Sequence, residues 1–191
     1  MKAGVLSLQG AAREHAVALK KCGAETVFVK HREQLDNLDC LVIPGGESTT
    51  IGKLLDRFGL GPALQEFMRS GRAVYGTCAG MILLANKVDG PPQYTLGGME
   101  ITVRRNAFGR QRESFEADLE IPVLGRELFR SVFIRAPLII RTGAGVEVLA
   151  TYRGRAVATR QGNLLVSSFH PELTDDIRMH AYFLRLAEKK Q

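Results

Sequence analysis

The sequence predicts an α/β fold of three layers, with helices on both faces of a mostly parallel central sheet. Two observations lead to this prediction. Short apolar runs alternate with segments of helical spacing between residues 3 and 85. From residue 99 onward, shorter runs of alternating polarity predict additional, mostly antiparallel strands in the C-terminal half. No linker is long enough to divide the chain, so we expect residues 1–191 to form a single domain.

The first half contains four apolar runs that end at turn residues. Strands are expected at residues 3–8, 26–29, 40–43 and 73–75. Helical spacing predicts helices at residues 12–22, 51–58, 62–70 and 81–85, with a short polar connector or helix at 32–38. Because parallel strands are joined by right-handed crossovers, their carboxyl ends meet at one edge of the sheet, where α/β proteins bind ligands.

The second half follows a Gly-Pro-Pro break at residues 90–92 and alternates in polarity. Strands are expected at residues 99–103, 115–119, 146–152, 156–159 and 164–168. The last of these strands leads directly to His170, and a helix from about residue 174 to residue 188 closes the chain.

The composition is that of an ordinary globular protein, with 45% hydrophobic and 24% charged residues. The net charge of +6 comes from scattered basic residues that are not interleaved with aromatics, so we expect no nucleic-acid partner. No apolar run approaches the roughly 18 residues of a membrane span, and none resembles a signal peptide, so we expect a cytoplasmic protein without a membrane contact. Three widely spaced cysteines predict reduced thiols, with neither disulfides nor a metal site.

Cys78 lies in a Gly-x-Cys-x-Gly turn between an apolar strand and a buried helix. A sharp turn of this kind lifts its central residue above the sheet, at the N-terminus of the helix. Gly76 and Gly80 flank the cysteine because a side chain at either position would collide with the tight backbone. Free N–H groups and the helix dipole favour a thiolate there. The turn therefore predicts a nucleophile, and a small core cysteine beside two turn glycines is the alternative.

A glycine pair, Gly45 and Gly46, follows the third predicted strand and precedes Glu47 and Ser48. The backbone N–H groups of such a loop can point into a cleft and stabilise a developing oxyanion. The GxxxxGK[ST] spacing of a phosphate-binding loop is absent. A plain strand-to-helix turn is the alternative.

His170 and Glu172 flank Pro171 at the end of the last predicted strand. Residues two apart on an extended segment point the same way, so Glu172 can hold one ring nitrogen of His170 while the other faces outward. Together with Cys78 they provide a nucleophile, a base and an orienting carboxylate. A solvated histidine in a turn is the alternative. His15 and His180 on predicted helices, and His31 in a loop, are expected to have surface or packing roles.

These three motifs resemble those of the class I, or triad, glutamine amidotransferases. Within that class, the sequence closely resembles the glutaminase subunits of pyridoxal 5′-phosphate synthases. The resemblance extends over nearly the whole chain and rests on five further segments: Leu8-Gln9-Gly10, Arg13-Glu14-His15, RNAFGRQ at 105–111, SFEAD at 114–118 and FIRAP at 133–137.

The resemblance implies a flavodoxin-like fold and the hydrolysis of L-glutamine to glutamate and ammonia, with no cofactor and no metal. It implies that Cys78 forms a γ-glutamyl thioester, that His170 transfers protons and that Glu172 orients His170. The ammonia would pass to a separate synthase subunit within a large hetero-oligomer, and docking on that subunit would activate the glutaminase.

The resemblance also assigns roles around the triad. It implies an oxyanion hole made by the N–H groups of Gly46 and Ala79, and a partner interface at Gln9 and Gly10. The residues implied to bind glutamine are Gly46, Glu47, Ser48, Arg105, Ile134 and Arg135.

Two other function classes stay open from the residues themselves. One is a cysteine hydrolase or thiol-redox enzyme of the same fold, against which the Gly-Gly-Glu-Ser loop and the His-Pro-Glu pair argue, and whether glutamine alone is turned over would distinguish it. The other is a non-catalytic subunit that only binds and regulates a partner, against which the intact Cys78, His170 and Glu172 argue. Histidine biosynthesis is the alternative destination for the ammonia, and the segment 105–111 favours vitamin B6 instead.

Overall fold

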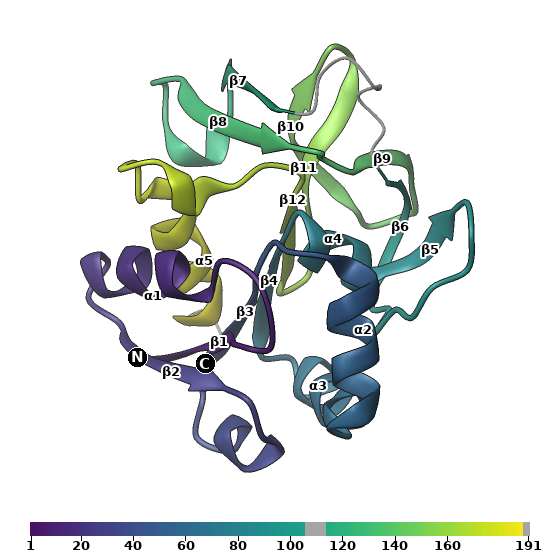
Figure 1. Ribbon diagram of the computed structural model, residues 1–191. Coiled ribbons are helices and arrows are strands. Elements are labelled where there is room, and N and C mark those ends of the chain that lie inside the picture. The colour runs from purple at the N-terminus through teal and green to yellow at the C-terminus, as the bar shows by residue number, and fades with distance from the viewer. Residues whose placement is uncertain (106–113, 189–191) are drawn as a thin grey trace.

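A seven-stranded sheet runs through the middle of the computed structural model, which describes residues 1–105 and 114–188 (Figure 1). Its strand order is β10-β11-β12-β4-β3-β1-β2. The strands are β1 (Lys2–Leu6), β2 (Glu25–Val29), β3 (Cys40–Ile43), β4 (Ala73–Thr77), β10 (Glu147–Tyr152), β11 (Arg155–Gln161) and β12 (Leu164–Ser167). The pairings among β2, β1, β3, β4 and β12 are parallel, and β11 and β10 extend the sheet in antiparallel pairing.

Helices cover both faces of this sheet (Figure 1). On one face lie α1 (Ala12–Lys21) and α5 (Arg178–Glu188), and on the other lie α2 (Ser48–Arg57), α3 (Leu60–Arg69) and α4 (Ala79–Leu84). Successive residues of a strand pack on opposite faces of the sheet, because their side chains alternate in direction. Val42 packs in the core under α1 and α5, whereas Leu41 and Ile43 pack in the core under α2, α3 and α4. The predicted three-layer, mostly parallel α/β fold is confirmed.

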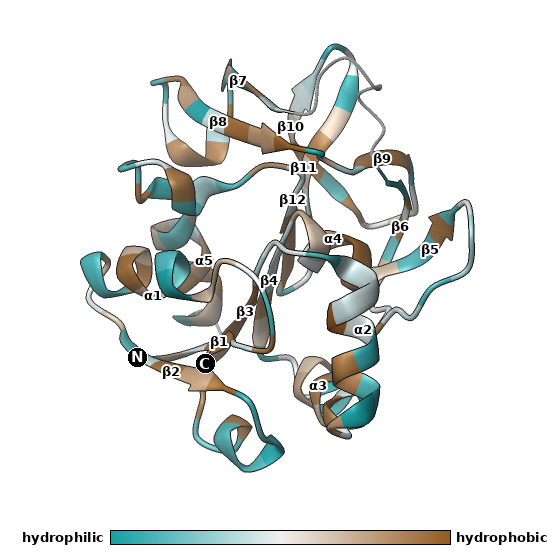
Figure 2. Ribbon diagram, in the orientation of Figure 1, coloured by the Kyte–Doolittle hydropathy of each residue, from teal (hydrophilic) through white to brown (hydrophobic). Residues whose placement is uncertain are grey.

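The central strands are apolar because both of their faces are covered (Figure 2). All four residues of β3 and all five of β4 are buried. This explains why these two strands were predicted from continuous apolar runs, without an alternating pattern.

In the part of the chain that the structure describes, two smaller sheets contain the other strands. β5 (Ala85–Asp89), β6 (Met99–Arg104) and β9 (Leu138–Thr142) form one, and β7 (Ser114–Leu119) pairs with β8 (Phe129–Ile134) in the other. These pairings are antiparallel except for β5 with β6. The sequence pattern did not predict β5, β8 or β9. In β8 the buried positions are Phe129, Ser131 and Phe133, so a buried serine interrupts the apolar alternation.

Three short 3₁₀ turns lie within the described residues, η1 (Arg32–Leu35), η2 (Pro122–Leu124) and η3 (Pro171–Leu173). The last helix, α5, begins at Arg178, four residues later than predicted from the sequence. The Asp176 carboxylate accepts a hydrogen bond from the Arg178 N–H at 3.0 Å, which stabilises the start of the helix at this point. Among the helices in the described ranges, none combines the length and apolarity that crossing a membrane requires.

Replacing Leu165 tests the placement of β12 at the centre of the sheet. Leu165 is fully buried between β11 and β4. We expect Leu165→Ala to lower the free energy of unfolding by about 2–5 kcal/mol, because the truncation leaves a cavity. The control is Leu128→Ala, which removes the same atoms from an exposed side chain. It should change the free energy of unfolding by no more than about 0.5 kcal/mol. Urea denaturation measures both, and equal losses would contradict this placement.

Candidate active site

The parallel pairing of β4 and β12 brings two distant segments to one edge of the sheet. Ser167 stands opposite Thr77 at the carboxyl ends of the two strands. Directly beyond them, the Cys78 N–H donates a hydrogen bond to Ser167 O at 2.8 Å. Three residues after Ser167, the His170 N–H donates to Val132 O of β8 at 2.8 Å. The backbone thus fixes the start of both functional segments.

Cys78 occupies a strained turn between β4 and α4. Its φ of 48° and ψ of −101° lie in a region that residues with a side chain rarely adopt. The two flanking glycines are required by close contacts. A Cβ on Gly76 would lie 2.6 Å from the backbone of Gly80, and a Cβ on Gly80 would overlap Ile43 O. The predicted reason for both glycines is therefore confirmed.

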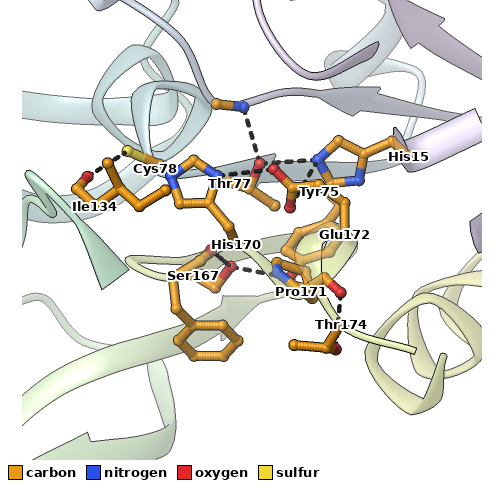
Figure 3. Close-up of polar contacts among 12 residues, drawn as sticks. His15, Tyr75, Thr77, Cys78, Ile134, Ser167, His170, Pro171, Glu172 and Thr174 are labelled. Carbon is orange, nitrogen blue, oxygen red and sulfur yellow. Dashed lines mark hydrogen bonds and ion pairs between the residues drawn. The ribbon is translucent and has the colours of Figure 1, made fainter. Parts of the chain in front are cut away.

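Cys78, His170 and Glu172 lie together, and none is more than 8% exposed (Figure 3). His170 Nδ1 is 2.7 Å from Glu172 Oε1, and Cys78 Sγ is 3.9 Å from Ile134 O. Burial lowers the pKa of His170, but hydrogen bonds with Cys78 and Glu172 outweigh it and raise this pKa to about 10. At neutral pH the imidazole therefore carries a proton that it can give to a leaving group.

The local geometry of the His170–Glu172 pair differs from the prediction. An extended segment was expected, but Pro171–Leu173 forms the 3₁₀ turn η3. The turn brings the Glu172 carboxylate back towards the ring of His170. Burial raises the pKa of Glu172, and the two imidazoles facing it, His15 and His170, more than reverse this, so the pKa lies below its usual value.

The glycine loop is held in one orientation by neighbours on two sides. The Gly45 N–H donates to Thr77 Oγ1 at 3.0 Å, and Gly45 O accepts from the Ala11 N–H at 3.2 Å. Since the carbonyl and the N–H of a trans peptide point in opposite directions, the Gly46 N–H points away from Ala11. The Glu47 N–H donates to Gln9 Oε1 at 2.8 Å, so the segment containing Gln9 packs directly on this loop.

A cavity of about 260 Å³ opens at this edge of the sheet. It is lined by most of the residues singled out from the sequence: Gln9, Gly46, Glu47, Ser48, Cys78, Ala79, Arg105, Ile134, Arg135 and His170, together with Ile82. Two predicted site residues, Glu172 and Gly10, do not line the cavity. Glu172 lies behind His170, and Gly10 packs so closely against Gly45 that a Cβ on Gly10 would overlap Gly45 O.

Two charged residues on the cavity wall are already paired. Glu47 caps α2 by accepting from the N–H groups of Thr49 and Thr50. Burial raises its pKa, but hydrogen bonds from the two threonine hydroxyls, and then from these N–H groups, outweigh burial and lower the pKa to about 2. Arg105 lies 3.1 Å from Glu47 Oε1 and 3.1 Å from Gln93 Oε1. The sequence analysis missed Gln93. The rest of the RNAFGRQ segment, residues 106–111, lies outside the described residues.

His15 and His180 correct the sequence analysis, which did not foresee their contacts with the site. Both side chains are fully buried, so a surface role is wrong. His15 Nε2 lies 3.3 Å from Glu172 Oε2, and His15 Nδ1 lies 2.9 Å from His180 Nε2. His15 shares the buried face of α1 with Ala12, Ala16 and Leu19, and this spacing is the sequence signal that predicts its burial. His31 is exposed, as expected.

No group of three or more His, Cys, Asp or Glu side chains in residues 1–105 and 114–188 is arranged to hold a metal ion. Cys22, Cys40 and Cys78 are free thiols. Burial, together with Asp39, raises the pKa of Cys40 to about 12, which makes that thiol a poor nucleophile.

A cysteine on a strand-to-helix turn, next to a carboxylate-held histidine in the wall of a small cavity, is the arrangement of a cysteine hydrolase built on an α/β sheet. Residues 5–189 match the model of the SNO glutamine amidotransferase family, and the chain belongs to that family.

Proteins and solved structures similar to this chain agree with the family. The pyridoxal 5′-phosphate synthase subunit PdxT of Pelotomaculum thermopropionicum is 61% identical over 96% of this chain and 94% of its own length. That of Geobacillus kaustophilus is 58% identical over 99% and 96%. A crystal structure of a glutamine amidotransferase, 53% identical, covers 97% of this chain and 98% of that one with a TM-score of 0.93. A Thermoplasma acidophilum structure described as a GMP synthase subunit, 18% identical over 98% and 94% with a TM-score of 0.71, shares the fold.

The cap on α2 predicts a pH-dependent contribution to stability. Because the folded pKa of Glu47 lies below its ordinary value, its stabilisation is present above that ordinary value and is lost as the pH falls towards 2. We expect Glu47→Ala to cost about 0.5–2 kcal/mol at pH 7, the usual range for a lost cap. The difference from wild type should shrink between pH 5 and pH 3.

Urea denaturation across this pH range measures the effect. Glu66→Ala, which removes an exposed carboxylate from α3, is the matched control and should differ little from wild type at any pH. A cost for Glu47→Ala that does not depend on pH would show that the carboxylate does not stabilise the helix through its charge.

Proposed function

We propose that this chain is the glutaminase subunit of a pyridoxal 5′-phosphate synthase. It hydrolyses L-glutamine to L-glutamate and ammonia, and delivers the ammonia to a synthase subunit. The single observation that carries the proposal is the Cys78–His170–Glu172 arrangement in a chain 61% identical, over nearly its full length, to a pyridoxal 5′-phosphate synthase subunit. The similarity to pyridoxal 5′-phosphate synthase subunits favours vitamin B6 biosynthesis over histidine biosynthesis as the destination of the ammonia.

In the proposed reaction, Cys78 Sγ attacks the side-chain amide carbon of glutamine, and the carbonyl oxygen becomes an oxyanion. The C–N bond then breaks, His170 donates its proton to the departing nitrogen, and ammonia leaves a γ-glutamyl thioester on Cys78. His170 next takes a proton from water, whose oxygen attacks the thioester carbon. The C–S bond breaks, and glutamate and the Cys78 thiolate are released. Glu172 keeps His170 Nδ1 protonated throughout.

The oxyanion is proposed to bind the N–H groups of Gly46 and Ala79. Ala79 is the first residue of α4, where a helix leaves its N–H groups without internal partners. The Gly46 N–H is directed away from the Ala11 side of its loop, and Gly46 lines the cavity. Glutamine is proposed to contact Gly46, Glu47, Ser48, Arg105, Ile134 and Arg135, which share that cavity.

The synthase subunit is proposed to dock at Gln9 and Gly10, in a large hetero-oligomer. These residues support the glycine loop, so a partner that contacts them can act on the oxyanion hole without entering the cavity. We further propose that residues 1–191 work as one domain in the cytoplasm. Two core clusters on opposite faces of one sheet support the single domain, and the three free thiols suit a reducing compartment.

Removing the proposed nucleophile tests the reaction. We expect Cys78→Ala to abolish glutamate release from L-glutamine, because no thioester can form. Its thermal unfolding and its binding to the synthase subunit should remain close to those of wild type. The matched control is Cys22→Ala, which removes a half-buried thiol at the end of α1 and should keep full activity. Residual turnover by folded Cys78→Ala protein would overturn the assignment.

Gly10 provides a test of the loop that carries Gly46. Its φ of +101° and its contact with Gly45 O leave no room for a side chain. We expect Gly10→Ala to displace the loop and reduce kcat, with the synthase subunit present, by about 10²-fold, the usual cost of losing one oxyanion donor. Gly145→Ala is the control, since Gly145 has a φ of +80° but no atom within 4 Å of its added Cβ.

Glutamate release, titrated with the synthase subunit, measures both variants. The backbone strain at Gly145 should lower stability without a change in kcat. Equal kcat values for the two variants would show that the loop does not depend on Gly10.

A further inference from the structure

Three fully buried polar side chains, none of which lines the cavity, form a connected group next to Glu172, and Figure 3 shows two of them, His15 and Thr77. His15 comes from α1, Thr77 from the end of β4 and His180 from α5. His15 Nε2 faces Glu172 Oε2 at 3.3 Å and Thr77 Oγ1 at 3.0 Å, and His15 Nδ1 lies 2.9 Å from His180 Nε2. Burying such groups is costly in free energy unless they are paired. None of the three takes part in the proposed reaction.

The hydrogen-bond partners of His15 and His180 determine which ring nitrogen of each carries the proton. If His15 carried its proton on Nδ1, the bare Nε2 would face the Glu172 carboxylate, and His180 would hold a buried Nδ1–H. His180 Nδ1 has no hydrogen-bond partner among the described residues. A buried donor without a partner is rarer in proteins than a buried acceptor without one. Both histidines therefore carry the proton on Nε2: His180 donates to His15, and His15 donates to Thr77 Oγ1, with Glu172 Oε2 lying 3.3 Å from the same nitrogen.

This arrangement gives each oxygen of the Glu172 carboxylate its own imidazole. Oε1 pairs with His170 at 2.7 Å, and Oε2 faces His15 at the longer distance of 3.3 Å. A carboxylate with only one partner can rotate about its last side-chain bond. The contact of Oε2 with the His15 ring, which comes from a different helix, restricts that rotation and so holds the direction in which His170 points, although Oε2 accepts no hydrogen bond from the described residues.

Thr77 connects this series of hydrogen-bonded side chains to the glycine loop. Its Oγ1 accepts from the Gly45 N–H at 3.0 Å and lies within hydrogen-bond distance of His15 Nε2. The histidine that faces Glu172 is thus one side chain away from the peptide that precedes Gly46. The triad carboxylate and the glycine loop therefore share a single buried support.

We propose that His15 is a positioning residue for the glutaminase reaction: through Nε2–H it orients the Glu172 carboxylate and, with Thr77, ties it to the Gly45 loop. This role rests on the proposed function. His15 touches neither the cavity nor the reacting atoms, and it acts through Glu172.

The charge state of His15 fits this role. Burial lowers its pKa, and His170 lowers it further, which outweighs the opposite effects of Glu172 and of Glu14 on its own helix. His180 and Tyr75, which also pack against the ring, are uncharged at neutral pH, since burial lowers the pKa of His180 to about 3 and raises that of Tyr75. A neutral donor orients the carboxylate without neutralising it, so its negative charge remains available to stabilise protonated His170.

Two amide substitutions test the contacts of the two ring nitrogens of His15 one at a time. The amide nitrogen of glutamine can reach the place of Nε2, whereas that of asparagine reaches only the place of Nδ1. His15→Gln should therefore keep the contact with Glu172, and His15→Asn should lose it while keeping the contact with His180. With the synthase subunit present, we expect His15→Asn to lower kcat about 10–100-fold, as the loss of an orienting partner does elsewhere, with KM nearly unchanged. His15→Gln should recover most of that loss.

The pH profile provides a readout that a merely structural effect would not move. If Glu172 is free to rotate in His15→Asn, His170 loses part of the support for its proton, and the alkaline limb of kcat should shift to lower pH. Leu19→Ala is the control, since Leu19 lies one turn further along α1, is fully buried and makes no polar contact. It should lower thermal stability but leave kcat and the alkaline limb unchanged.

Nitrogen NMR of histidine-labelled protein tests the tautomer without any turnover, and the four histidines make the spectrum simple to assign. We expect His15 to be protonated on Nε2, and protonation on Nδ1 would overturn the proposal. Equal kcat values for His15→Gln and His15→Asn, in a preparation whose wild type is active, would also overturn it. An inactive wild type would instead refute the proposed function itself, and this role with it.

Discussion

The site depends above all on the parallel pairing of β12 with β4. These strands are distant in the sequence, yet Ser167 lies opposite Thr77 and accepts the Cys78 N–H. Because the two strands run in the same direction, the segments that follow them emerge at the same edge of the sheet. An antiparallel β12 would have delivered His170 to the opposite edge. The C-terminal half of the chain must therefore return to the centre of the sheet before any chemistry is possible.

That pairing places a carboxylate and an imidazole in a nearly closed site, where unpaired charges would be costly. The structure satisfies them from several elements at once. Glu172 has His170 on one side and His15 on the other, and Thr77 joins His15 to the Gly45 loop. The face of the sheet under α1 and α5 therefore contains a polar cluster inside an otherwise apolar core. Two helices that look like ordinary covering helices also determine the geometry of the site.

The sequence predicts those features that are local. β3 and β4 are apolar runs bounded by turn residues, and the glycines around Cys78 follow from its tight turn. What it does not predict depends on contacts between distant segments. β5 has the sequence Ala-Asn-Lys-Val-Asp, which does not favour a strand until β6 pairs with it. The burial of His15 follows from its place on the apolar face of α1, but its contacts with Glu172 and His180 depend on η3 and α5, and Gln93 gains its role from Arg105.

The segment between β1 and α1 connects the proposed docking residues with the proposed catalytic site. Gln9 holds the Glu47 N–H and Ala11 holds Gly45 O, so this segment fixes the glycine loop from one side while Thr77 fixes it from the other. The same segment leads directly into the helix that bears His15. A partner bound at Gln9 and Gly10, as proposed, would therefore act on two things together: the peptide that offers the Gly46 N–H, and the helix that orients Glu172. Because both effects arise from one short segment, control by docking needs no movement of the central sheet.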